Sequence, residues 1–301
     1  MSTSASQNAN YAVRDRDLKY YIFDWDNNIL HMPTRIHLQR KTDDGEWVPH
    51  SVSTALFSVI RNDSEHYRPP ANDWESAFVE FRDINIDDEN VFLRDTKSAI
   101  DNVISGESQP APCFVKFRQT LIEGRLFAIV TARGHDPEII QSAVRYFIET
   151  VLSDDDRATM MENLWGYLAC FEQDHALGSD EEVLTNYLSL NKYHGVMSTH
   201  FKALMQHNKE TEASPEEGKQ FAIKDFVEHV VNIAQATGLD RPISVGFSDD
   251  DPNNLVAVEN YIRDQLARLF PGIKFVVYDT SDPEVEEGRK ITVTGQLNLN
   301  I

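Results

Sequence analysis

Four short apolar runs are spread along the chain, and longer segments with helical periodicity separate them. The runs are YYIF (20–23), LFAIV (126–130), ISVGF (243–247) and IKFVVY (273–278). Continuous apolar runs of this length are typical of parallel strands that are covered by helices on both faces. The pattern therefore predicts four buried strands of a mainly parallel sheet.

Three amphipathic segments lie between these apolar runs and carry sequence signals for the ends of helices. Asp136 is a candidate N-cap before Pro137, and Ser214 with Glu217 forms a capping-box pattern. The predicted helices cover residues 137–152, 214–238 and 253–270. Strand–helix alternation of this kind predicts an α/β fold, with a Rossmann-like, doubly wound core that has helices on both faces of the sheet.

Two long stretches interrupt the alternation and are interpreted as insertions on the core. The first contains a predicted hairpin around Asp44 and Gly45, and the second is mostly helical. The expected organisation is an N-terminal tail (1–17), a core (18–30, 113–152 and 214–301), a cap insertion (31–112) and a helical insertion (153–213).

Charge and cysteine content narrow the class of protein. The 301 residues include 28 basic and 49 acidic side chains, and the net charge is −21. Such a chain disfavours nucleic acid and anionic membranes as partners. No stretch approaches the ~20 apolar residues of a membrane helix, and the first ten residues show no signal-peptide pattern. Only Cys113 and Cys170 are present, so no disulfide framework is expected and a cytoplasmic location is predicted.

Polar side chains follow the first three predicted strands at the point where each strand ends. Ligands of open α/β sheets bind beyond the carboxyl ends of the strands, so these side chains are expected to meet. They are Asp24 and Asp26 after the first strand, Thr131 and Arg133 after the second, and Asp249, Asp250 and Asp251 after the third.

These residue types suit phosphoryl transfer through an aspartate. One carboxylate attacks phosphorus, and a second exchanges a proton with the leaving group or with water. A hydroxyl and an ammonium group stabilise the phosphate oxygens, and further carboxylates provide the oxygen ligands that Mg²⁺ prefers. The ammonium group is expected on the helix at 214–238, from Lys224 or Lys219, and Lys202 is a weaker alternative.

In their order along the chain, FDWDNN, VTARG, a helical lysine and GFSDDDPNN resemble the four motifs of the haloacid dehalogenase superfamily. The resemblance covers about residues 18–280 and implies Mg²⁺-dependent phosphatase chemistry. It implies Asp24 as nucleophile and metal ligand, and Asp26 as general acid and base with a metal-binding backbone carbonyl. It further implies Thr131 as phosphate ligand, Lys224 as the neutralising lysine, and Asp249 with Asp250 as metal ligands. The expected substrate is a phosphorylated small molecule.

The sequence also departs from the family pattern. Asn27 and Asn28 stand where a Gly-Thr pair is usual, and Phe247 stands where a fourth-motif aspartate often follows Gly246. The ligand among residues 249–251 is thus open, and the acid cluster is alternatively a helix N-cap. Arg133 is either a substrate ligand or part of a structural salt bridge.

Two other functions are compatible with the sequence. A binding or scaffold protein of the same fold, with catalysis lost, would bind metal without turnover. Transfer of the phosphoryl group to an acceptor other than water is a third interpretation. The sequence does not indicate the oligomeric state.

Overall fold

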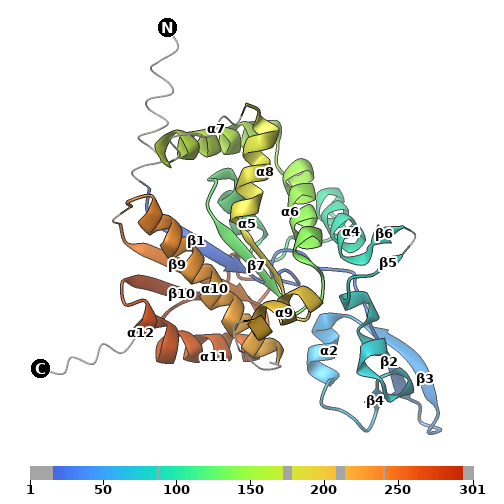
Figure 1. Ribbon diagram of the computed structural model, residues 1–301. Coiled ribbons are helices and arrows are strands. Elements are labelled where there is room, and N and C mark those ends of the chain that lie inside the picture. The colour runs from blue at the N-terminus through green and yellow to red at the C-terminus, as the bar shows by residue number, and fades with distance from the viewer. Residues whose placement is uncertain (1–15, 87, 172–177, 208–213, 240, 294–301) are drawn as a thin grey trace, which may run out of the picture.

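A computed structural model describes residues 16–86, 88–171, 178–207, 214–239 and 241–293, and within them one mainly parallel sheet forms the centre of the molecule (Figure 1). Its strand order is β11-β10-β9-β1-β7-β8, and only the β10–β11 pair is antiparallel. The six strands are β1 (Leu18–Phe23), β7 (Phe127–Thr131), β8 (Lys192–Gly195), β9 (Ile243–Asp249), β10 (Ile273–Asp279) and β11 (Arg289–Val293).

The first strand lies at the topological switch point of this sheet. The chain continues from β1 to β7 and β8 on one side, and later returns to β9 and β10 on the other side. Tyr21 pairs in parallel with Phe127 of β7 and with Gly246 of β9. The carboxyl ends of β1, β7 and β9 therefore meet at one edge, which is where α/β sheets bind ligands.

Side chains that alternate along the strands pack into two hydrophobic cores on opposite faces of the sheet. Phe23 packs into one core and Ile22 into the other. Helices that supply buried residues to the first core are α4 (Val91–Ser105), α5 (Phe114–Ile122), α6 (Pro137–Val151), α7 (Asp154–Phe171) and α8 (Asp180–Leu190). The second core is covered by α9 (Thr199–His207), α10 (Pro215–Ala236), α11 (Pro252–Tyr261) and the π-helical turn η3 (Ile262–Leu266), followed by α12 (Ala267–Leu269). The predicted α/β fold with helices on both faces is confirmed.

The predicted helix ends agree with the structure at most positions. Ser214 and Glu217 form both bonds of the capping box at the start of α10. Asp136 occupies the N-cap position of α6, but its side chain makes no capping hydrogen bond. The predicted helix at 253–270 is divided by the π-helical turn after Tyr261.

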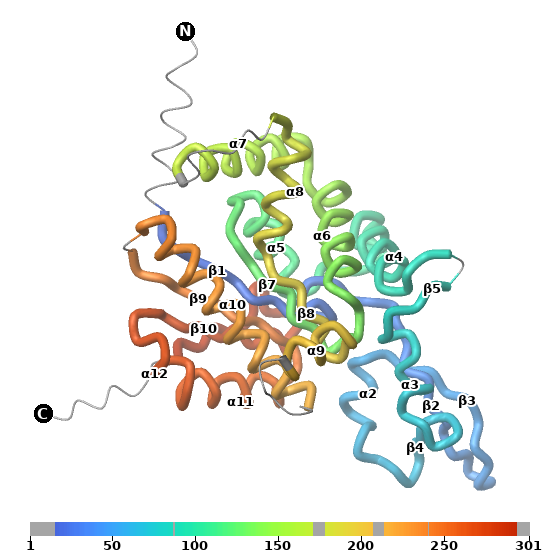
Figure 2. Tube along the Cα trace, viewed as in Figure 1, coloured from blue at the N-terminus to red at the C-terminus, as the bar shows by residue number. Residues whose placement is uncertain are grey.

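Residues 31–90 form a small lobe beyond the carboxyl end of β1 (Figure 2). The predicted hairpin is confirmed, because β2 pairs with β3 around a turn in which Gly45 has a φ of 85°. Ile36, Leu38 and Val52 form the centre of its core. The lobe contains β2 (Ile36–Lys41), β3 (Trp47–Val52), α2 (Thr54–Ile60), β4 (Tyr67–Arg68), η1 (Pro70–Asn72), α3 (Trp74–Ala77), η2 (Val79–Phe81), β5 (Asn85–Ile86) and β6 (Glu89–Asn90).

Both expected insertions contain a segment that belongs to the central body. Within 31–112, α4 packs into the main core through Phe92 and Ile100. Within 153–213, β8 pairs with β7 at the edge of the sheet. An edge strand has a neighbour on one side only, and the short KYHG segment carries no apolar run that would have revealed it. Across the described ranges, no helix combines the length and apolar character needed to cross a membrane.

Candidate functional site

Three aspartates from the two central strands converge at the carboxyl edge of the sheet. Asp24 follows β1 directly, Asp249 ends β9, and Asp250 is the next residue. Each offers one carboxylate oxygen, and these oxygens lie within 4.8 Å of one another. Asp24 and Asp249 are buried and Asp250 is half-buried. The parallel pairing of Phe23 with Ser248 explains this meeting, because it sets the next residues of both strands side by side.

A buried lysine from α10 joins this acidic triad, which comprises Asp24, Asp249 and Asp250. Nζ of Lys219 donates to Oδ2 of Asp249 at 2.6 Å and to Oδ1 of Asp24 at 3.4 Å. Lys224, in contrast, pairs with Glu228 at 3.8 Å, and its side chain is 36% exposed. Of the two candidate lysines on this helix, Lys219 is therefore the one that contacts the aspartates, and Lys224 is not in contact with them. The two residues are five apart, so they project from different sides of the helix.

Burial controls the electrostatics of the triad. It raises the pKa of Asp24 well above the ordinary value, an effect that Lys219 opposes and the neighbouring carboxylates reinforce. Burial and Asp249 raise the pKa of Asp250 to about 7. Burial lowers the pKa of Lys219, but Asp24 and Asp249 outweigh it, so the net change is a rise. The lysine therefore stays charged, while Asp24 and Asp250 resist ionisation without a further cation.

The turn after Asp24 is held by two asparagines. Asn27 has a φ of 53°, in the left-handed region that asparagine tolerates better than most residues. Asn28 is fully buried and donates Nδ2 to the backbone oxygen of Asp24 and to the hydroxyl of Ser248, both at 2.9 Å. Its Oδ1 accepts a hydrogen bond of 2.9 Å from the hydroxyl of Thr280. The residues that depart from the family pattern thus fix the backbone around Asp24.

Asp26 lies near the triad in sequence, but its side chain is bound by Arg133. Nε of Arg133 donates to Oδ2 of Asp26 at 2.8 Å, and Nη2 donates to Oδ1 at 2.6 Å. The guanidinium group is 1% exposed and lies 4.4 Å from the ring centre of Phe81 and 5.4 Å from that of Phe92. Of its remaining donors, Nη2 also reaches Thr34 at 2.8 Å. The structure therefore contains the salt bridge that was one of the two interpretations of Arg133.

Thr131 and His135 complete the buried polar side chains that follow β7. Thr131 ends the strand beside β1 and accepts the backbone N–H of Arg133 at 3.4 Å. Both ring nitrogens of His135 are buried and, within the ranges the structure covers, make no hydrogen bond. Burial and the adjacent Arg133 lower the pKa of His135 to about 3, so the imidazole is neutral at physiological pH.

The start of α11 gives Asp251 a different role from that of Asp249 and Asp250. Asp251 is the N-cap of that helix and accepts the backbone N–H of Asn253 at 2.9 Å. Asp249 accepts the backbone N–H of Asp251 at 3.0 Å and Nδ2 of Asn254 at 3.1 Å. The N-cap interpretation therefore applies to Asp251, whereas Asp249 and Asp250 belong to the triad. The sequence signals did not indicate Asn254.

The small lobe contacts the same edge of the sheet through α2 and through Phe81. Nδ2 of Asn27 donates to the hydroxyl of Thr54 at the start of α2, and Arg61 at the other end of α2 lies 3.8 Å from a carboxylate oxygen of Asp251. On the other side, the backbone N–H of Gly134 donates to the carbonyl of Phe81 at 2.8 Å. The lobe is thus attached to the turns that carry the polar residues.

The triad has the composition of a divalent-cation site. Its three carboxylates outnumber its one ammonium group by two charges. Hard cations such as Mg²⁺ prefer carboxylate oxygens, and burial together with the neighbouring carboxylates raises the pKa of Asp24, an effect that a bound cation would oppose. The buried acidic group is a possible metal site, and its residues do not by themselves identify the ion.

No model of a protein family matches this chain, and neither a curated protein nor a solved structure matches it. The interpretation of the triad therefore rests on its residues, their geometry and their charge.

Proposed function

We propose that this protein is a Mg²⁺-dependent phosphohydrolase that cleaves phosphomonoesters through an aspartyl-phosphate on Asp24. The observation that carries the proposal is the convergence of Asp24, Asp249 and Asp250, with Lys219 in contact with the first two. The order of motifs that resembles the haloacid dehalogenase superfamily supports the same chemistry. Both lines of support concern one edge of the sheet, at the switch point of its topology.

The proposed reaction has two steps. First, a carboxylate oxygen of Asp24 attacks the phosphorus, the bond from phosphorus to the ester oxygen breaks, and Asp26 gives that oxygen a proton. Next, water attacks the phosphorus of the aspartyl-phosphate, the bond from phosphorus to the Asp24 oxygen breaks, and Asp26 takes the proton of the attacking water. Inorganic phosphate leaves, and both aspartates return to their initial states.

Other residues of the edge stabilise charge during these steps. The ammonium group of Lys219 neutralises Asp24 and the incoming phosphate, and the Thr131 hydroxyl donates to a phosphate oxygen. Mg²⁺, held by Asp24, Asp249 and Asp250, would supply further charge neutralisation for the phosphate oxygens. A backbone carbonyl at Asp26 remains a proposed additional ligand.

The salt bridge to Arg133 sets a condition on this mechanism. Both carboxylate oxygens of Asp26 accept N–H groups of the guanidinium, so Asp26 must release Arg133 before it can serve as acid. A substrate phosphate or carboxylate is a suitable exchange partner for the guanidinium, since it presents the same pair of oxygens. The contacts of α2 with Asn27 and Asp251 favour a small phosphorylated substrate over a macromolecule.

The test is hydrolysis of p-nitrophenyl phosphate with MgCl₂ or with EDTA. Asp24→Asn should lower the rate at least about a thousand-fold, because the nucleophile is lost. Asp279→Asn is the matched control, since Asp279 ends the adjacent strand β10 but bonds with Ser281 and Arg289. Equal rates for the wild type and Asp24→Asn would refute the proposal.

One observation favours a second candidate, a metal-binding protein without turnover. Asp26, the proposed general acid, is buried in its pair with Arg133. This candidate predicts Mg²⁺ binding by calorimetry and no hydrolysis across phosphorylated metabolites, nucleotides and phosphopeptides. Hydrolysis of any of these at an ordinary enzyme rate would exclude it.

A further inference from the structure

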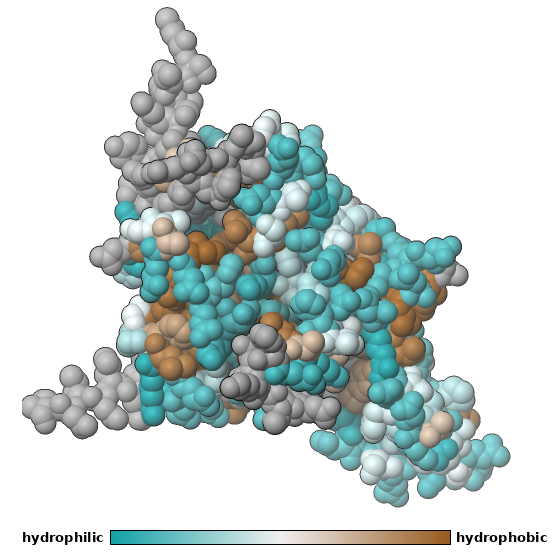
Figure 3. Space-filling view, viewed as in Figure 1, coloured by the Kyte–Doolittle hydropathy of each residue, from teal (hydrophilic) through white to brown (hydrophobic). Residues whose placement is uncertain are grey.

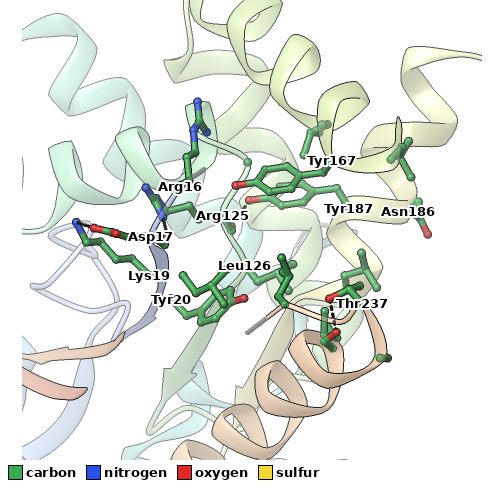
Figure 4. A pocket seen from close by; sticks show the side chains of 18 of the residues that line it. Arg16, Asp17, Lys19, Tyr20, Arg125, Leu126, Tyr167, Asn186, Tyr187 and Thr237 are labelled. Atoms are coloured by element: carbon green, nitrogen blue, oxygen red, sulfur yellow. Dashed lines mark hydrogen bonds and ion pairs between the residues drawn. The ribbon is translucent and has the colours of Figure 1, made fainter. Parts of the chain in front are cut away.

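A cavity of about 390 Å³ lies at the amino edge of the sheet, opposite the acidic triad (Figure 4). The start of β1 and the segment just before β7 line it, together with α7, α8 and the C-terminal part of α10. In the space-filling view, apolar side chains show between α8 and α10 on this side of the molecule (Figure 3). Four residues of extended chain, about 13 Å, lie between Tyr20 of the cavity wall and Asp24, so a molecule bound here would not touch the triad.

The walls of this cavity are mostly apolar and aromatic, and their spacing leaves room for a metabolite-sized molecule. Protein sites for small molecules usually have volumes of about 300–1,000 Å³ and apolar walls with few polar groups. Tyrosine rings contribute flat apolar surface with a polar tip. The apolar and aromatic walls include Leu126, Leu164, Leu168, Ile233, Tyr20 and Tyr187.

Most charged groups around the cavity are already paired. Lys19 lies 3.1 Å from a carboxylate oxygen of Asp17, and the guanidinium of Arg125 is paired with Glu123. The hydroxyl of Tyr187 donates to the backbone oxygen of Arg125 at 2.7 Å, and in Figure 4 its hydroxyl end points toward that arginine. These groups form a fixed polar end for the cavity.

Arg16 brings a further positive charge to this end of the cavity, and the carboxylate of Glu123 lies within its electrostatic range. Its Nη1 donates to the backbone oxygen of Glu123 at 3.0 Å, and its Nη2 donates to Oδ1 of Asn163 at 2.9 Å. Both acceptors are neutral, and both contacts hold the guanidinium at the polar end. Because Lys19 is paired with Asp17 and Arg125 with Glu123, the charge of Arg16 leaves an excess of one positive charge among these described groups, and this local excess favours an anion.

We propose that the cavity is a second ligand site, which binds a small aromatic carboxylate with its ring between Leu126, Leu164 and Ile233 and its carboxylate toward Arg16. The aromatic rings and leucines supply the apolar contact, and the guanidinium supplies the charge that favours a monoanion over a neutral analogue. This site is independent of the proposed hydrolase activity, since it shares no residue with the triad.

The test uses two probes of nearly equal shape, naphthalene-2-carboxylate and naphthalene-2-carboxamide. Calorimetric titration of the full chain should give saturable binding of the carboxylate with a Kd of about 0.1 mM or lower, and at least about tenfold weaker binding of the carboxamide. Absence of saturable binding of the carboxylate up to about 5 mM overturns the proposal. Equal affinity for both probes also overturns it, because the charge argument then fails.

Variants locate the binding site. Ile233→Trp on α10 and Leu168→Trp on α7 place a larger side chain in the cavity wall and should each weaken carboxylate binding at least tenfold. Gln235→Trp is the matched control, since Gln235 is exposed on the same helix. Urea unfolding verifies that each variant is folded. If one of the two tryptophan variants Ile233→Trp and Leu168→Trp does not fold, the other one provides the test. Unchanged affinity in a folded filling variant contradicts the proposed location.

Arg16→Gln tests the charged end without altering the apolar walls. It should weaken carboxylate binding at least fivefold and leave carboxamide binding unchanged. Arg145→Gln is the control, because Arg145 is a surface arginine of α6 that pairs with Glu181. If Arg16→Gln binds both probes as the wild type does, Arg16 is not the recognition group and the proposal is wrong.

Discussion

Asn28 connects three parts of the central sheet through one buried amide. Its side chain bonds the turn after β1, the end of β9 at Ser248 and the segment after β10 at Thr280. Its backbone oxygen also accepts the N–H of Cys113, just before α5. The position of Asp24 thus depends on an asparagine whose own chemistry is structural.

We expect Asn28→Ala to destabilise the protein by about 3 kcal/mol, because three side-chain hydrogen bonds are lost in a buried place. Asn27→Gly is the comparison. Glycine adopts the left-handed backbone of Asn27 without strain, so its cost should stay below about 1 kcal/mol. Urea unfolding followed by circular dichroism measures both. Equal destabilisation by the two variants would contradict the role of the Asn28 side chain in holding the three segments together.

Lys219 and Lys224 provide a matched pair on one helix. Lys219→Met leaves two buried carboxylates without their cation and should cost about 3 kcal/mol in the absence of metal. Lys224→Met removes a half-exposed pair with Glu228 and should change stability by less than about 0.5 kcal/mol.

The free energy of unfolding, measured with EDTA and with saturating MgCl₂, checks both variants. Mg²⁺ should restore part of the stability that Lys219→Met loses, since it binds the folded state only. A larger loss of unfolding free energy from Lys224→Met than from Lys219→Met would contradict the contact of Lys219 with the aspartates.

At the scale of elements, the loop after β7 connects the first turn to the small lobe. Arg133 binds Asp26 of the turn and the hydroxyl of Thr34 at the base of the lobe. Thr34 in turn donates to Asp95 of α4 at 2.5 Å. This series of hydrogen bonds therefore runs through buried groups from the sheet edge to the lobe. The low dielectric of the buried surroundings strengthens each of these bonds.

A double-mutant cycle tests this connection. Arg133→Met and Asp26→Asn should each cost about 3–5 kcal/mol, because each leaves a buried partner without its counter-group. The double variant should cost at least about 2 kcal/mol less than the two single losses together. The reference cycle is Arg145→Met with Glu181→Gln, an exposed pair for which coupling below about 1 kcal/mol is expected. Additive losses for Arg133 and Asp26 would mean that the pair is not coupled.

For the molecule as a whole, the sequence predicted those parts that follow from burial and topology. The four apolar runs became β1, β7, β9 and β10, since strands buried on both faces need continuous apolar residues. The meeting of Asp24 with Asp249 followed from the rule for strand ends.

What the sequence did not predict depends on local geometry between segments distant along the chain. The short edge strand β8 has no apolar signal, and the choice between Lys219 and Lys224 depends on the rotation of α10 relative to β1. The four hydrogen bonds of Asn28 involve residues up to 252 positions away, which no local pattern can indicate.

The charge of the whole site should make metal binding depend on pH. Burial and Asp249 raise the pKa of Asp250 to about 7 in the folded protein, whereas an unfolded aspartate titrates near about 4. Between these values the metal-free folded state holds an extra proton at Asp250, so this group's contribution to stability falls as the pH rises from about 4 to about 7. Mg²⁺ binds the ionised carboxylate, so its affinity should rise over the same interval, by up to about tenfold per pH unit.

Calorimetric titration with MgCl₂ at pH 5.5, 6.5, 7.5 and 8.5 measures this dependence. The affinity should increase up to about pH 7 and then level off as Asp250 becomes fully ionised. Asp250→Asn should bind Mg²⁺ more weakly and with a smaller dependence on pH, because the carboxylate that must release its proton is gone. Asp251→Asn should retain the wild-type pattern, since Asp251 caps α11 and stands outside the triad. An affinity that stays constant across these four values would mean that Mg²⁺ binding does not require ionisation of Asp250.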